Sequence, residues 1–288
     1  MKPNRILTVL ALFCIVFGAY AKKKQVDYPH ADIKVGYNYH KVFMRGSDGV
    51  IERDLPFVLL ANTKESKFYS PPTEYKDSLQ STPKGKAIYD KLLHEAINKY
   101  IESKDRSSMG DATYKTHLYV FKSKSDNLYE IYDYVGMTGH FYYTEPLDDM
   151  AWEITDSAKT ILGYECFMAT ADYHGRHWTA WFTPEIPIQD GPWKLHGLPG
   201  LILEASESTG QHHFTATGLE TTNAEIKPVY NIKGRYDKTS RIEMLKMERN
   251  GRDNGAAIVK AQIGLDLGPD APITEESRKY DFLETDYH

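Results

Sequence analysis

The sequence has few cysteines, no excess of positive charge and almost no long apolar runs, and each shortage excludes a class of protein. Two cysteines among 288 residues cannot build a disulfide-rich fold. The 40 acidic side chains outnumber the 35 lysines and arginines, whereas nucleic-acid binding requires a clustered basic surface. Beyond residue 21 no apolar run is long enough to span a bilayer as a helix. We therefore expect no nucleic-acid partner and no membrane span in the mature chain.

The one long apolar run lies at the N-terminus and is typical of a secretory signal. Lys2 and Arg5 precede the apolar residues 6–18, and Ala19-Tyr20-Ala21 has the small-x-small pattern of a cleavage site. We predict that residues 1–21 are removed near Ala21. The mature protein is then exported to the periplasm or the extracellular space.

The remaining residues 22–288 show no internal repeat and no linker, so we predict a single domain. Removal of the signal takes Cys14 away and leaves Cys166 alone. A cysteine within an apolar strand pattern is expected to be buried and structural, the alternative being a reactive thiol. The polar tail beyond Gly268 is expected to pack loosely.

Apolar and aromatic side chains recur at every second position through much of the chain, which is the period of a half-buried strand. The connections are short, so neighbouring strands should be antiparallel, and the segments 57–60 and 67–69 should form a hairpin. The last four segments named below are expected to be antiparallel neighbours. Strands are predicted at residues 33–39, 57–60, 67–69, 116–121, 128–135, 140–144, 151–155, 163–173, 177–183, 200–205 and 212–218.

Two stretches have the helical period instead. Residues 83–103 carry an apolar stripe, with Thr82 as the N-cap and Pro83 in the first turn. A second helix is expected at residues 238–248. Sequential strands with about two segregated helices indicate the α+β class, dominated by a meandering antiparallel sheet. The helix at 83–103 should cover one face of that sheet.

A turn-rich stretch, GPWKLHGLPGLILEA at residues 191–205, lacks the patterns of two common catalytic loops. It has neither the Gly-x-x-x-x-Gly-Lys-Ser/Thr of a phosphate loop nor the Gly-x-Ser-x-Gly of a nucleophile elbow. Gly197 and Gly200 instead permit backbone geometry that other residues resist, so the stretch is predicted to start a strand. Leu201 and Leu203 are expected on one face of it and Ile202 on the other.

The residues Gly197, Leu198, Pro199, Gly200, Leu201 and Ile202 resemble the motif that gives the GLPGLI family of exported bacterial proteins its name. The resemblance extends to residues 160–166 and 180–188 and to Arg-Lys-Tyr-Asp-Phe at 278–282. That family is similar to the N-terminal bowl-like domain of some peptide-N-glycosidases, so the resemblance implies a curved, bowl-like sheet. It implies no catalytic residues.

Three histidines are candidate ligands for zinc or copper: His174 and His177 bracket a tight turn, and His196 lies beside the motif. On a strand, positions i and i+3 point to opposite faces, so the turn would have to bring the first two together. The alternative is that they are solvated turn histidines. No catalytic residue and no cofactor is predicted.

Aromatic side chains suggest a ligand surface, because stacked rings with nearby polar groups suit sugar rings or apolar ligands. The alternative is ordinary core packing. The candidates are Trp152, Trp178, Trp193, Tyr132 and Tyr134.

The sequence thus favours an exported, non-catalytic binding or accessory protein of the bacterial cell envelope. A concave, aromatic-lined sheet would hold a glycan, a peptide or an apolar ligand, or contact another envelope protein. Two alternatives are a hydrolase with an unidentified site and a periplasmic metal-binding protein.

Overall fold

A computed structural model describes residues 27–44, 49–105, 109–110, 112–135, 138–230, 234–264, 266, 270 and 272–288. The predicted signal at residues 1–21 lies outside the described residues. Within the described part of the chain, no helix is both long enough and apolar enough to cross a membrane.

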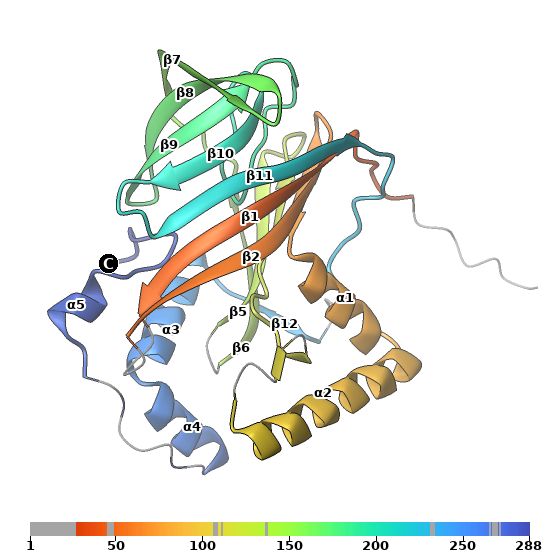
Figure 1. Cartoon of the computed structure of the whole chain (residues 1–288), viewed down its shortest axis with the longest axis vertical. Coiled ribbons are helices and arrows are strands. Elements are labelled where there is room, and N and C mark those ends of the chain that lie inside the picture. The colour runs from red at the N-terminus through yellow and green to blue at the C-terminus, as the bar shows by residue number, and fades with distance from the viewer. Residues whose placement is uncertain are drawn as a thin grey trace, which may run out of the picture.

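Twelve strands form one curved sheet, and all neighbouring pairs but one are antiparallel (Figure 1). The predicted α+β class is therefore confirmed. The order across the sheet is β12-β6-β5-β4-β3-β2-β1-β11-β10-β9-β8-β7. The strands are β1 (Ile33–Met44), β2 (Val50–Ala61), β3 (Glu65–Tyr69), β4 (Tyr119–Ser123), β5 (Leu128–Val135), β6 (Gly139–Pro146), β7 (Glu153–Ile161), β8 (Tyr164–Tyr173), β9 (Arg176–Thr183), β10 (Leu201–Glu207), β11 (His212–Thr221) and β12 (Tyr236–Lys238).

The sheet consists of two meanders that β1 joins. Strands β2 to β6 pair in chain order, and so do β7 to β11. The predicted hairpin of β2 and β3 and the predicted neighbours β8 to β11 are confirmed. Strand β1 lies between β2 and β11, and the short β12 adds in parallel to β6. Chain order alone did not predict these last two pairings.

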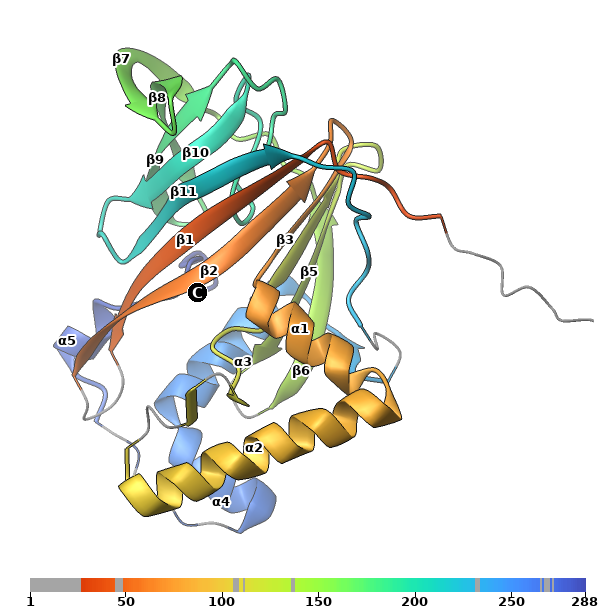
Figure 2. The ribbon, with the colours of Figure 1, turned by 45° about the vertical axis from the view of Figure 1, so that its right-hand side comes forward.

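Both faces of the central strands are buried, each in a different core. Phe57 and Leu59 of β2 lie in the main core, on the face where the two meanders meet. Val58 and Leu60 lie in a second core on the opposite face, with Tyr132 of β5 and Ile226. Figure 2 shows the steep path of β3, β5 and β6 against the diagonal path of β1, β2 and β11, which gives the sheet its curvature. We call the main-core face the inner face and the other the outer face.

Five helices accompany the sheet in the described residues, where about two were expected. The predicted helices correspond to the second and third of these, and Thr82 accepts a hydrogen bond from the amide of Gly85 (3.1 Å), as its N-cap role requires. The first helix was missed because it buries Thr73, Lys76 and Asp77 and so lacks an apolar stripe. The helices are α1 (Pro71–Gln80), α2 (Pro83–Ser103), α3 (Arg241–Asp253), α4 (Gly255–Ile263) and α5 (Glu275–Arg278).

The expectation that α2 covers a face of the sheet is wrong. It packs on α1 and lies across the bottom of Figure 1, away from the sheet. Only Gly85 and Ala96 are buried along it, whereas Ile88 and Ile101 are 44% and 56% exposed. An amphipathic pattern predicts an apolar face, but it does not specify which element covers that face.

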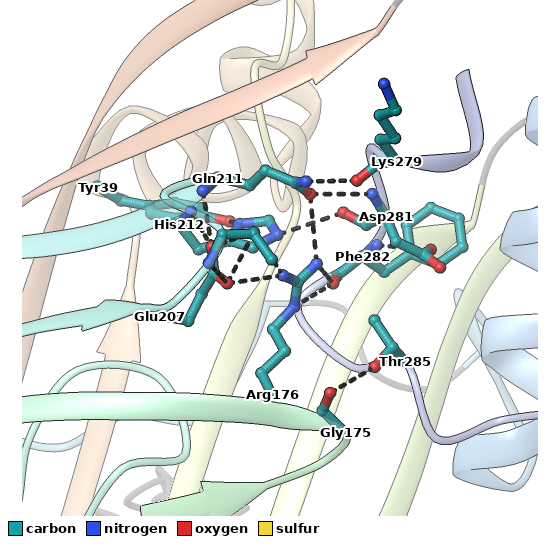
Figure 3. Close-up of polar contacts among 11 residues, drawn as sticks. Tyr39, Gly175, Arg176, Glu207, Gln211, His212, Lys279, Asp281, Phe282 and Thr285 are labelled. Carbon is teal, nitrogen blue, oxygen red and sulfur yellow. Dashed lines mark hydrogen bonds and ion pairs between the residues drawn. The ribbon is translucent and has the colours of Figure 1, made fainter. Parts of the chain in front are cut away.

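The expected loose packing of the tail is also wrong for residues 279–287. Phe282, Glu284 and Tyr287 are buried. The carbonyl of Phe282 accepts a hydrogen bond from Nε of Arg176 (2.9 Å), and Thr285 Oγ1 donates to the carbonyl of Gly175 (3.0 Å) (Figure 3). The tail is polar because its polar groups have specific partners on the sheet.

Single buried side chains confirm and correct other expectations. Cys166 is buried with a free thiol whose pKa burial raises, as a structural cysteine requires. In β10 the predicted alternation fails, because a register shift between Ile202 and Glu204 interrupts the pairing with β9. Leu201, Ile202 and Leu203 are consequently all fully buried in the main core.

The glycine geometry of the motif is confirmed at two positions. Gly197 has φ +87°, and no atom lies within 4 Å of the point where a Cβ would stand. Gly200 has φ +158°, and a Cβ there would overlap the carbonyl of Thr183 and the backbone of Pro184. The two glycines therefore separate backbone strain from steric exclusion.

We expect Gly200→Ala to lower the free energy of unfolding by several kcal/mol, because both the φ angle and the overlap with β9 oppose a side chain. Gly197→Ala is the matched control and should cost about 1 kcal/mol, from the left-handed conformation alone. Urea denaturation of both variants beside the parent measures the difference. Equal costs would contradict the close approach at Gly200.

Candidate functional site

The three candidate metal histidines are not brought together. His177 is exposed and lies 2.8 Å from Oδ1 of Asp172. His196 is 5% exposed, with its Nδ1 2.8 Å from the hydroxyl of Tyr129, so it is not a solvated turn histidine. His174 lies at the other end of the loop region, beside the C-terminal residues. A site that uses all three is therefore absent from the structure.

His174 has its own acidic neighbours, Glu284 and Asp286, and one ligand atom of each lies within 4.8 Å of the others. These carboxylates already have cationic partners. Glu284 lies 2.7 Å from Nζ of the buried Lys194 and 2.8 Å from Nη1 of Arg241, which also contacts Asp286 at 2.7 Å. A divalent ion would have to displace two fixed cations, so the cluster is an ion-pair network that anchors the tail.

The aromatic candidates divide between core and surface. Trp178 and Trp193 are fully enclosed in the main core, and Tyr132 lies in the outer core, so these three have packing roles. Trp152 is half-buried and donates from Nε1 to the carbonyl of His196 (2.7 Å). Tyr134 is 39% exposed on the outer face. The five rings therefore do not line one concave surface.

The loop that carries the motif is held by a buried ion pair. Lys122 of β4 donates to Oδ1 of Asp190 (2.6 Å) and to the carbonyls of Gly191 (2.8 Å) and Leu195 (3.1 Å). Both charged side chains are completely buried. Burial alone would raise the pKa of Asp190, but Lys122 and Lys124 beside it lower the pKa below its usual range. The loop is thus fixed to the opposite half of the sheet.

A cavity of about 110 Å³ opens next to this loop on the inner face, between the sheet and α3. We call it the inner pocket. It lies where β1, β5 and β6 face α3 and the C-terminal segment. Its lining residues are Tyr39, Lys41, Leu118, Ile131, Asp133, Tyr143, Trp193, Met244, Leu245, Glu248, Phe282, Leu283 and Glu284.

Three ionisable side chains in the inner pocket stand where the fold calls for apolar ones. Lys41 follows Val35, Tyr37 and Tyr39 on the inner face of β1, and Asp133 lies between Ile131 and Val135 on β5. Glu248 comes one helical turn after the buried Met244 of α3. Within the described residues, no ion pair joins Lys41, Asp133 or Glu248 to any partner.

The protonation of this trio reflects its surroundings. Burial, reinforced by Glu248, raises the pKa of Asp133 to about 7, although the amide of Tyr134 donates to its Oδ1 (2.7 Å). Burial also raises the pKa of Glu248 and lowers the pKa of Lys41, and the attraction between these two groups opposes both shifts. Strongly perturbed pKa values in a cavity are typical of functional sites.

The sequence contained a signal for these residues that composition and motif searches miss. A charged residue on the apolar side of an alternating strand requires either a partner or a function. Lys122 and Lys194 met this criterion and have partners, whereas Lys41 and Asp133 have none. The pattern alone could not separate the two groups, because the partners come from distant parts of the chain.

Comparisons with known proteins support the family resemblance over a short stretch. A family model described as "Protein of unknown function (Porph_ging)" matches residues 173–204, which include the whole Gly197–Ile202 motif. No curated protein sequence matches the chain.

Among solved structures, the chain is similar to PNGF-II in two crystal forms, each with 12% identity and a TM-score of 0.47 over 76% of this chain. It spans about a third (34% and 33%) of those chains. A putative outer membrane lipoprotein-sorting protein domain from Vibrio parahaemolyticus has 6% identity and a TM-score of 0.23, with 70% of this chain and 89% of that chain covered.

The raised pKa of Asp133 predicts a specific pH dependence of stability. Between the pKa of the unfolded carboxyl, about 4, and the folded value of about 7, the folded state retains a proton that the unfolded state releases. The parent therefore loses stability as pH rises through this window. We expect Asp133→Asn to gain about 1–3 kcal/mol relative to the parent between pH 4 and pH 8. Urea denaturation at both pH values tests this.

The exposed Asp148 provides the control for that measurement. Asp148→Asn should keep the same stability difference from the parent at both pH values. A constant difference for Asp133→Asn as well would show that Asp133 ionises like a solvated carboxyl.

The buried ion pair of the loop gives a second prediction. Lys122→Met leaves Asp190 buried with a more distant cation, Lys124 at 3.3 Å, and should cost about 3–5 kcal/mol of unfolding free energy. Lys124→Met removes a partly exposed cation from the same carboxylate and should cost about 1 kcal/mol. Thermal melting of the two variants compares them. Equal losses would show that the loop does not depend on Lys122.

Proposed function

We propose that the protein is an exported, non-catalytic binding protein of the bacterial cell envelope, whose inner pocket holds the amino end of a small polar ligand. The observation that carries the proposal is the unpaired trio of Lys41, Asp133 and Glu248 in an otherwise apolar cavity. Evolution of such a cavity for stability alone would be expected to favour apolar side chains at these positions.

The charge of the pocket favours a cationic group. Two carboxylates, Asp133 and Glu248, face a single ammonium, that of Lys41, and the third carboxylate, Glu284, already has Lys194 and Arg241. The pKa values of Asp133 and Glu248 are raised because the empty cavity supplies no sufficient counter-charge. A bound ammonium would supply that charge and lower both pKa values.

Size and walls define the part of the ligand that enters. A volume of about 110 Å³ corresponds to the liquid volume of about four water molecules. An amino group with two or three attached atoms fits, and the rest of a larger glycan or peptide would remain outside. Tyr143 and Trp193 provide aromatic walls on which an ammonium group is favoured, and Lys41 offers a donor to a ligand oxygen.

Ethanolamine and its uncharged counterpart ethylene glycol form a matched pair of probes. We expect ethanolamine to bind the parent and ethylene glycol not to bind, as measured by isothermal titration calorimetry. Binding should be tighter at pH 8 than at pH 5, because ethanolamine stays protonated while the carboxylates must release protons. Asp133→Asn and Glu248→Gln should each weaken it about tenfold or more, which corresponds to about 1.4 kcal/mol.

Asp148→Asn serves as the control and should bind like the parent. Equal binding of the two probes, or binding that survives both pocket substitutions, would contradict the proposal. Export is tested separately by N-terminal sequencing of the protein from the periplasmic and extracellular fractions, which should begin at Lys22.

A hydrolase is the second candidate, because a carboxyl group with a pKa of about 7 is also what general acid–base catalysis requires. Turnover of chromogenic glycoside, ester or peptide substrates that Asp133→Asn abolishes would favour this function over binding. The proposed binding protein should show no such turnover.

A further inference from the structure

A second pocket, of about 390 Å³, lies on the outer face of the same strands. We call it the outer pocket. It is formed where α1 and α2 approach β5, β6 and β12, so that Asp133 and Tyr134, adjacent on β5, face the two different pockets. Its polar lining residues are Gln80, Lys86, His117, His140 and Arg235, and Tyr89 and Tyr114 supply aromatic walls.

The lining of the outer pocket is rich in hydrogen-bond donors. Among the described residues, no carboxylate lines it. The nearest one is Asp77, which is completely buried and already accepts hydrogen bonds from the hydroxyls of Tyr114 (2.8 Å) and Tyr119 (2.7 Å). Arg235 contacts Asp77 through Nη2 (2.8 Å), and its side chain makes no other hydrogen bond with the described residues. Several guanidinium N–H groups therefore remain for a ligand.

Two imidazoles complete the lining. The rings of His117 and His140 lie with their centroids 5.4 Å apart, and both pack against Tyr134. The Nδ1 atoms of both histidines are buried without a hydrogen-bond partner, as is the hydroxyl of Tyr236, which is paired with His140 across β12 and β6. Buried polar atoms without partners are rare in folded proteins and are commonly explained by a missing ligand or ion.

We propose that the outer pocket binds a small oxyanion, a sulfate or phosphate group, between Arg235, Lys86 and the two imidazoles. This inference is independent of the proposed function of the inner pocket. Arginine and lysine are the side chains that most often bind such anions, and arginine offers two parallel N–H groups to them.

The local charge explains why an anion is favoured over a metal ion. Burial and then the neighbouring His140 lower the pKa of His117 to about 4, and burial and then Arg235 lower that of His140 to about 4. The cations that repel a proton here would also repel a metal ion, and Asp77 only partly compensates for them. An anion would reverse the effect and raise both pKa values.

The charge arrangement also fixes the pH dependence of binding. The groups that face the two histidines are Arg235 and Lys76, which lower the pKa of His117, and Asp77, which raises it. Lys86 lines the pocket as a further cation. Because an anion stabilises the protonated imidazoles, its affinity should increase as the pH falls from 8 towards 5. Sulfate is the appropriate probe for this, since its charge is constant over the range, whereas phosphate itself titrates.

NMR titration of the full protein with inorganic sulfate and inorganic phosphate tests the proposal through the ring resonances of His117 and His140. We expect saturable shifts of both rings, at least about fivefold tighter binding of sulfate at pH 5 than at pH 8, and higher pKa values of both histidines when sulfate is bound. Lys86→Gln, at an exposed position, should weaken binding by about threefold to tenfold without affecting folding. Arg235→Gln should weaken it more.

Lys84→Gln, one turn earlier in α2 and outside the pocket, is the matched control and should bind like the parent. Asp133→Asn should also retain sulfate binding, which distinguishes failure of this proposal from failure of the inner-pocket proposal. A comparison of glucose 6-phosphate and glucose 6-sulfate with the inorganic ions identifies whether a sugar adds affinity. Absence of shifts at either histidine, unchanged affinity in Lys86→Gln and Arg235→Gln, or binding of Zn²⁺ in preference to both anions would overturn the proposal.

Discussion

The ammonium group of Lys122 holds the two halves of the sheet together at their point of closest approach. It comes from β4 in one meander and binds Asp190, Gly191 and Leu195 of the loop that leads into β10 of the other. The three acceptors fix the loop backbone, and a buried ammonium with three oxygen partners is well compensated for its lost hydration. Trp193 and Lys194 follow in the same loop and extend into the inner face.

The position of the inner pocket follows from that constraint. Trp193 is one of its walls, and Lys194 neutralises Glu284 at its edge. The protein therefore uses buried charge in two different ways. Lys122, Lys194 and Arg176 are matched by acidic partners and carbonyl groups and connect distant parts of the chain. The unmatched trio of the inner pocket connects nothing and lowers stability, which is the usual relation between functional groups and the folds that carry them.

Sequence periodicity predicted most of the strands and the helix at 83–103, because alternation and helical stripes reflect local burial. It did not predict α1, whose buried side chains include Lys76 and Asp77, or the ordered tail, whose polar groups bind Arg176 and Gly175. These elements are held by specific polar pairs between residues far apart in the chain, and such pairs leave no periodic pattern.

The same limit applies to the sites. The motif glycines were predicted correctly because φ angles and close approaches are local properties. The aromatic candidates were largely misplaced, since the number of tryptophans gives no information on which of them the core takes. Asp133 was visible only as a carboxylate on the apolar side of a strand, and its meaning depends on β1 and α3, which reach it from both ends of the chain.

The place of β1 between β2 and β11 has a consequence for the order in which the molecule can form. Lys34 of β1 and its partner Glu220 of β11 are separated by 186 residues. At a synthesis rate of about 5–20 residues per second, β1 waits roughly 10–40 s before the strand that closes its free edge has been made. Until then a twelve-residue edge strand exposes its backbone and its aromatic inner face. The first strand to be made is therefore among the last to be completed, and the sheet closes from its middle late in folding.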